Sequence, residues 1–325
     1  MSALRYPRFF ACEDMRFACA ALFTLCLQSQ SEADSITLTN GKCIDCNIKQ
    51  VSFTTLTAEA ENSTTRTPEV LWINLAEVKI VSLSGVSPEL VQAEPTAENL
   101  ARLKAFWTAM HPLIGKPGNQ IAHAGLRLAV QAVAKNILSV GIEEALEIVR
   151  RIKTAAIEAA HRIEAQALEM RILAELGRFE DARAECQKWE DPRFPLTLRV
   201  SAKLTAGICG HEEMRVFLFE NPRWTEDFRV HKERSEIYER TMDGYIFAAL
   251  FSGEKDSIAQ AALYHAARFL ILCGEQSQAI SIASTLRRRF PESAYAKTIE
   301  DEIKRAKQAH PVIDHQGAHR PSCLP

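Results

Sequence analysis

The sequence predicts a mainly α-helical chain that opens with a small all-β module. Short segments of alternating apolar and polar residues fill positions 36–83, whereas apolar residues recur at helical spacing from Thr96 onward. One spacing occurs twice in the helical part, as Gly177, Phe179, Ala182 and Trp189 and again as Gly274, Gln276, Ala279 and Leu286, followed by Pro291. Glycine, a small residue and an apolar stripe at fixed intervals are typical of stacked helix–turn–helix pairs.

Residues 1–33 have the pattern of a secretory signal peptide. Arg16 precedes an apolar run at 17–27, and small residues lead up to a cut after Ala33. Two acidic residues fit poorly in the charged start of such a signal, so translation from Met15 fits better. We therefore expect a periplasmic or secreted bacterial protein, and the alternative is a buried N-terminal helix.

Residues 34–85 are predicted to form the β module. Asn40-Gly41 lies between two alternating segments, which is a strong hairpin signal because both positions accept positive φ. Five short strands in about fifty residues favour a small barrel or a strongly bent sheet. The strands are expected at Ile36–Thr39, Lys42–Val51, Ser52–Ala60, Val70–Ile73 and Val78–Leu83.

The rest of the chain is predicted to be a linker, a helical domain and a disordered tail. Thr96 with Asn99 predicts the start of the first helix. The linker covers 86–95, the helical domain 96–308 and the tail 309–325, with helices expected near 120–140, 142–152 and 155–176. Residues 192–252 show no clear repeat register.

Two segments resemble known families. GRFEDA, from Gly177 to Ala182, and the segment 261–305 resemble tetratricopeptide repeats, in which alanine lets two helices approach closely. The segment 36–81, from ITLTNGK to VLWINLAEVKIV, resembles the Sm-like or SH3-like barrels that open some bacterial envelope proteins. The first resemblance implies a curved helical array, and an irregular helical bundle is the alternative.

Cys43-Ile44-Asp45-Cys46 is a C-x-x-C motif in a predicted strand. Three strand steps separate the two Cα atoms by roughly 10 Å, beyond the roughly 7 Å that a disulfide allows. Alternation also directs the two side chains to opposite faces. We therefore expect two unrelated cysteines, and a structural disulfide at a bulge, a metal site or a redox site is the alternative.

Other polar motifs fit ordinary surface roles better than chemistry. His211-Glu212-Glu213 lacks the second histidine of a zinc-protease helix. Arg287-Arg288-Arg289 fits a helix end, where cations complement the dipole, or a patch that binds a partner. The tail residues His310, His315, His319 and Cys323 could bind a transition metal or be scattered in a disordered tail. Glu143, Glu144 and Glu147 fit a solvated helix face, and Asn62-Ser63-Thr64 is a glycosylation sequon.

Composition and motifs favour a binding protein. The chain has 325 residues, 47% apolar and 25% charged, with a formal net charge of -2, which gives no attraction for nucleic acid. No later stretch is long and apolar enough for an integral membrane span. We expect a non-catalytic exported protein that binds a protein or peptide partner, without a catalytic residue, cofactor or metal. A weaker possibility is a scaffold that self-associates through its terminal repeat.

An enzyme is the alternative function. Its site would lie in residues 192–252 and would process an envelope polymer, either a saccharide or a peptide. Aromatic and acidic side chains of that segment could line a cleft or pack within a helix pair; they are Trp224, His231, Tyr238 and Tyr245 with Glu226, Asp227 and Glu233. A deep pocket with carboxylates of shifted pKa would favour the enzyme, and a shallow groove would favour the binding protein.

Overall fold

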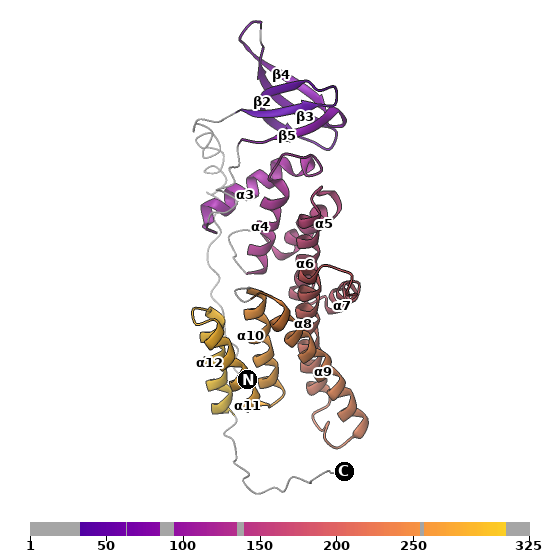
Figure 1. Ribbon diagram of the computed structural model, residues 1–325, viewed down its shortest axis with the longest axis vertical. Coiled ribbons are helices and arrows are strands. Elements are labelled where there is room, and N and C mark those ends of the chain that lie inside the picture. The colour runs from indigo at the N-terminus through magenta and orange to yellow at the C-terminus, as the bar shows by residue number, and fades with distance from the viewer. Residues whose placement is uncertain (1–32, 63, 85–93, 135–139, 254–256, 310–325) are drawn as a thin grey trace, which may run out of the picture. The chain divides into compact units, whose positions relative to one another are not determined.

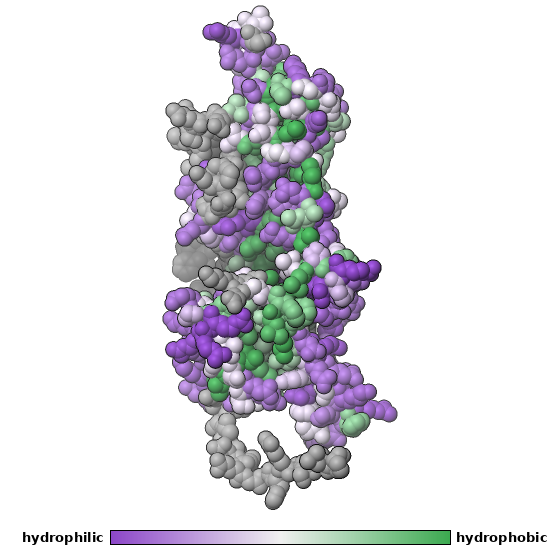
Figure 2. All heavy atoms as spheres, in the orientation of Figure 1, coloured by the Kyte–Doolittle hydropathy of each residue, from purple (hydrophilic) through white to green (hydrophobic). Residues whose placement is uncertain are grey.

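The computed structural model describes residues 33–62, 64–84, 94–134, 140–253 and 257–309 (Figure 1, Figure 2). The chain divides into two compact units, residues 1–124 and 125–325. The predicted signal peptide and tail lie outside the described residues, except for Ala33 and Ala309. Within the described part of the chain, every helix is too short or too polar to pass through a lipid bilayer.

A five-stranded antiparallel sheet begins the first unit. Its strands are β1 (Asp34–Leu38), β2 (Cys43–Val51), β3 (Thr55–Glu61), β4 (Pro68–Asn74) and β5 (Val78–Ser82), in the order β4-β3-β2-β1-β5. The five predicted strands are confirmed, with ends that differ by a few residues. The predicted hairpin is also confirmed, since Gly41 has a φ of 85° and the Lys42 N–H donates to Asn40 Oδ1 at 2.9 Å.

Strand β2 belongs to both halves of the sheet. Its first residues, Cys43–Cys46, pair with β1, and its later residues, Asn47–Val51, pair with β3. The register shifts between Ile48 and Gln50, and such a bulge bends a strand. The bent sheet encloses a small core whose fully buried residues are Ile36, Leu56, Ala58 and Val81.

Helix α3 (Ala97–Met110) starts where the sequence predicts. Thr96 Oγ1 accepts a hydrogen bond from the Asn99 N–H at 3.2 Å, which satisfies a free donor of the first turn. After the short 3-10 helix η3 (His111–Leu113), the chain returns to the sheet. The Val81 N–H donates to the Pro117 carbonyl at 3.1 Å, so this turn covers the outer edge of β5.

The second unit is an array of helices. They are α4 (Ile121–Val133), whose first residues belong to the first unit, α5 (Ile142–Ala155), α6 (Ala159–Glu175), α7 (Phe179–Gln187), α8 (Leu196–Glu220), α9 (Phe228–Phe251), α10 (Ser257–Leu272), α11 (Gln276–Arg289) and α12 (Ala294–Ala309). From α5 to α12 each helix packs on the next, and α6–α8, α8–α10 and α10–α12 also touch. Contacts mainly between near neighbours are typical of a helical array.

The two copies of the repeated spacing form the same turn. Gly177 and Gly274 have φ values of 72° and 83°, which residues other than glycine adopt at a cost. Arg178 N–H donates to the Leu173 carbonyl, and Glu275 N–H donates to the equivalent carbonyl of Leu270. Both bonds belong to the Schellman arrangement that ends a helix. Ala182 and Ala279, five residues after each glycine, are fully buried.

Helices α8 and α9 approach each other through glycines. A Cβ atom at Gly207 would lie 2.7 Å from Tyr245 Cε1, and one at Gly244 would lie 2.7 Å from the Lys203 carbonyl oxygen. Gly210 leaves equally little room beside Thr241. This close helix–helix crossing differs from the glycine turn of the two repeat copies.

Candidate interaction site

A groove of about 640 Å³ lies between α11 and α12. Its floor is apolar, because Ala283 and Ile303 are buried and Ile280 is 37% exposed. Ile280, Ala283 and Arg287 follow one another at helical spacing and therefore share one face of α11. Pro291 ends this helix and turns the chain into α12.

The rim of this α11–α12 groove is cationic. Arg287, Arg288 and Lys304 line it, against one lining carboxylate, Glu300. Arg287 Nη1 lies 3.0 Å from Glu300 Oε1, whereas Arg288 has no ion-pair partner among the described residues. Exposed ion pairs of this kind contribute about 1 kcal/mol or less, so the cations can exchange partners at small cost.

A second groove, of about 330 Å³, lies between α7, α8 and α9 and is acidic. Five glutamates line it: Glu180, Glu212, Glu213, Glu220 and Glu233. Arg183 bridges two of them, Glu180 at 3.8 Å and Glu213. The Arg215 side chain donates to Glu212 and lowers the pKa of that carboxyl, which is therefore ionised at neutral pH. This second groove suits cationic groups better than a reaction that needs a protonated acid.

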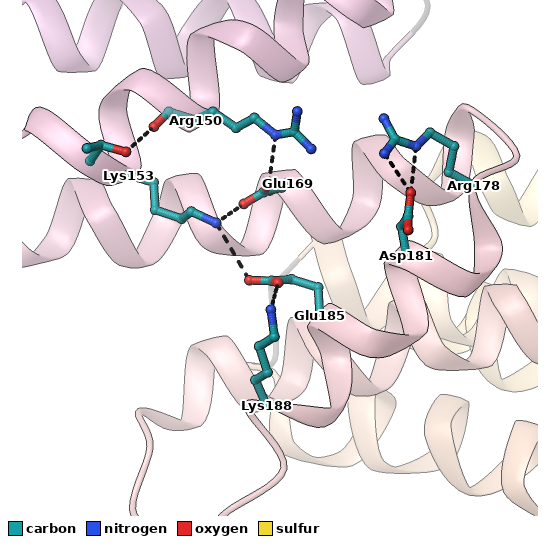
Figure 3. Close-up of polar contacts among 8 residues, drawn as sticks. Arg150, Lys153, Glu169, Arg178, Asp181, Glu185 and Lys188 are labelled. Carbon is teal, nitrogen blue, oxygen red and sulfur yellow. Dashed lines mark hydrogen bonds and ion pairs between the residues drawn. The ribbon is translucent and has the colours of Figure 1, made fainter.

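Ion pairs connect α5, α6 and α7 beside the first repeat turn (Figure 3). Glu169 is buried and accepts hydrogen bonds from Arg150, at 3.0 Å, and from Lys153. Lys153 also lies 3.7 Å from Glu185. Burial opposes ionisation of Glu185, but the Lys188 hydrogen bond and the charge of Lys153 outweigh it and lower the pKa of this carboxyl. These charges stabilise one another, so the network has a structural role.

The aromatic residues predicted for an enzyme cleft pack against other side chains. The Tyr238 and Tyr245 rings lie 5.5 Å and 6.4 Å from the Phe269 ring of α10. Trp224 is covered by the Arg234 guanidinium at 4.1 Å and lies 5.6 Å from His231.

The carboxylates predicted beside them do not converge on one point. Asp227 caps α9 by accepting from the Arg229 N–H at 2.8 Å, and Glu233 lines the acidic groove. Glu226 is exposed in the turn before α9. The structure therefore does not bring the aromatic and acidic residues together at one cleft.

The remaining predicted motifs lie apart from the grooves, except for Glu212 and Glu213. Cys43 is exposed and Cys46 is buried, and both thiols are free, as the strand geometry predicts. Glu143, Glu144 and Glu147 are exposed on α5. Asn62 Oδ1 accepts from the Thr64 N–H at 2.9 Å, and Ser63 lies outside the described residues.

His211 packs on the Phe269 ring at 5.5 Å, and burial lowers its pKa to about 4. Among the residues described, no group of three or more histidine, cysteine or acidic side chains could bind a metal. His310, His315, His319 and Cys323 lie outside the described residues.

Sequence reasoning identified the arginines of the α11–α12 groove but not its floor. Ile280, Ser284, Ile303 and Lys304 were not singled out, although Ile280 and Ser284 stand at helical spacing with Arg287. The helical spacing of Ile280, Ser284 and Arg287, on a helix that ends in arginines, is the sequence pattern that could have identified this surface. No known protein family, curated protein or solved structure matches the chain.

Proposed function

We propose that this chain is a non-catalytic, exported protein-binding or scaffold protein. The observation that carries the proposal is the α11–α12 groove, which combines an apolar floor with a cationic rim. Such a groove fits an amphipathic helix whose apolar face covers Ile280 and Ile303 and whose carboxylates reach Arg288 and Lys304. The partner is therefore an acidic amphipathic segment of another protein.

We place the helical array among tetratricopeptide-like arrays and the β module among Sm-like or SH3-like barrels. The identical turns at Gly177 and Gly274 and the buried alanines after them support the first assignment. The bulged β2, shared by both halves of the sheet, supports the second. Export rests on the signal-peptide pattern of residues 1–33. N-terminal sequencing of the mature protein from a periplasmic fraction tests export, with Asp34 as the expected first residue.

Two synthetic peptides test the groove with defined probes. Both are amphipathic helices with leucine on one face; one has glutamate and the other has lysine on the polar face. We expect the purified protein to bind the glutamate peptide in fluorescence anisotropy and to bind the lysine peptide at least about tenfold more weakly.

Charge reversals assign the binding to the groove. Arg288→Glu should weaken binding of the glutamate peptide by about tenfold, because it replaces an attraction by a repulsion. Arg305→Glu is the matched control, since Arg305 is exposed on α12 but does not line the groove. Equal binding of the two peptides, or equal effects of the two substitutions, would contradict the proposed site.

A further inference from the structure

Strand β4 is an open edge of the sheet. In the described sheet its one strand neighbour is β3, through a register that runs from Pro68↔Glu61 to Asn74↔Thr55. The backbone groups on its other side therefore have no strand partner. Free edges pair readily with another strand, and proteins commonly block them with charged residues, bulges or an internal proline. Here the proline stands at the first position, Pro68, where it does not interrupt the strand.

Two large apolar side chains stand on this edge strand. Trp72 is 76% exposed and Val70 is 57% exposed, whereas Ile73, which lies on the opposite face of the strand, is buried. Because side chains alternate along a strand, Val70 and Trp72 lie on one face of the sheet. An open edge that also carries exposed apolar side chains is typical of a pairing surface rather than of a protected edge.

The opposite edge of the sheet is not available for pairing. The Val81 N–H of β5 donates to the Pro117 carbonyl at 3.1 Å, and Lys116 Nζ donates to the Val78 carbonyl at 2.6 Å. A head-to-tail assembly, in which β4 of one copy pairs with β5 of the next, would have to displace this turn. The remaining pairing between copies is β4 with β4, which is two-fold symmetric and closes at two chains.

The sequence of β4 is self-complementary in that arrangement. The strand has seven residues, so an antiparallel pair with full overlap has Leu71 on the two-fold axis. Val70 of each copy then faces Trp72 of the other on the same side of the sheet, a favourable aromatic–β-branched pair that occurs twice. Glu69 faces Ile73, so no like charges stand opposite each other.

We propose that β4 is a dimerisation strand, through which two copies of this chain join their sheets into one. The occupant of the edge is a second copy, because the full-overlap register pairs Val70 with Trp72 twice and opposes no like charges. This interface is separate from the α11–α12 groove and does not depend on the function proposed for that groove.

Sedimentation equilibrium of the purified protein tests the dimer. We expect a monomer–dimer equilibrium that Trp72→Lys shifts toward monomer, with a dissociation constant raised by about tenfold or more, because one substitution removes both cross-strand pairs. Val70→Lys is a second variant with the same expected effect, and circular dichroism confirms that each variant is folded. Phe219→Lys is the control, since Phe219 is 86% exposed on α8 and should leave the equilibrium unchanged.

Cysteine pairing tests the register. When Val70→Cys and Trp72→Cys chains are mixed and mildly oxidised, the disulfide should join position 70 of one chain to position 72 of the other, while one native Val70–Trp72 pair remains. Either chain alone should crosslink much less. A protein that stays monomeric at hundreds of micromolar would overturn the proposal. So would a dimer that Trp72→Lys and Val70→Lys leave intact, or an open series of larger species.

Discussion

Two half-buried histidines should make the helical array sensitive to mild acid. His211 lies on α8 against Phe269, and the His265 ring of α10 stacks on Tyr245 with centroids 6.1 Å apart. Burial, followed by the charge of Arg268, lowers the pKa of His211 to about 4. Burial, the nearby His211 and two arginines lower the pKa of His265 to about 3.

The direction of the effect follows from proton linkage. Both pKa values are lower in the folded than in the unfolded chain, where a histidine titrates near 6.5, so the unfolded state binds more protons below that pH. The free energy of unfolding is therefore greatest above pH 6.5 and falls as the pH is lowered. Between pH 7.5 and pH 5.0 each histidine lowers the free energy of unfolding by about 2 kcal/mol, so the pair lowers it by about 4 kcal/mol.

Urea unfolding at pH 7.5 and pH 5.0, followed by far-UV circular dichroism, measures this loss. The interval lies above the range in which carboxyls such as Glu185 and Glu212 titrate, since their pKa values are lowered from 4.5. His265→Phe retains a flat ring and removes the proton site. The difference in unfolding free energy between the two pH values should therefore shrink by about 2 kcal/mol. Substitution of the exposed His231 by glutamine is the control. An unchanged pH difference in His265→Phe would refute the reasoning.

Three further predictions concern packing, turns and thiols. Gly244→Ala should lower the free energy of unfolding by about 2 kcal/mol, because its Cβ meets a backbone carbonyl, whereas Gly253→Ala, in open space, should not. Gly274→Ala should cost about 1 kcal/mol in the same assay, because of its positive φ. In the native protein Cys43 should react with a thiol reagent and Cys46 should not, since burial raises the Cys46 pKa to about 11; mass spectrometry after labelling distinguishes them. Equal labelling of both cysteines, or Gly244→Ala and Gly274→Ala variants that are as stable as the wild type, would count against these assignments.

Local signals in the sequence were sufficient for much of the fold. Gly41 fixes the hairpin loop because few residues other than glycine accept its φ of 85°, and Thr96 starts a helix by capping the N–H of Asn99. The turns at Gly177 and Gly274 were visible for the same reason, since glycine adopts positive φ more readily than other residues.

Features that depend on distant residues could not be read in this way. The crossing of α8 and α9 depends on Gly207 meeting Tyr245, 38 positions later, and no local pattern marks such a pair. The floor of the α11–α12 groove likewise needs Ile280 and Ile303 from two helices. The arginines at the end of α11 were predicted, but only the packing of α12 against α11 makes them the rim of a groove.

Site-specific photo-crosslinking in the producing cell tests the proposed binding groove most directly. A photoreactive residue replaces Ser284, which lines the groove, or Thr298, which is exposed on α12 outside it. We predict that the Ser284 position gives a discrete crosslinked protein partner, that Arg288→Glu removes this product, and that the Thr298 position gives none. Equal crosslinking from both positions, or a Ser284 product that persists in Arg288→Glu, would contradict a partner-binding groove between α11 and α12.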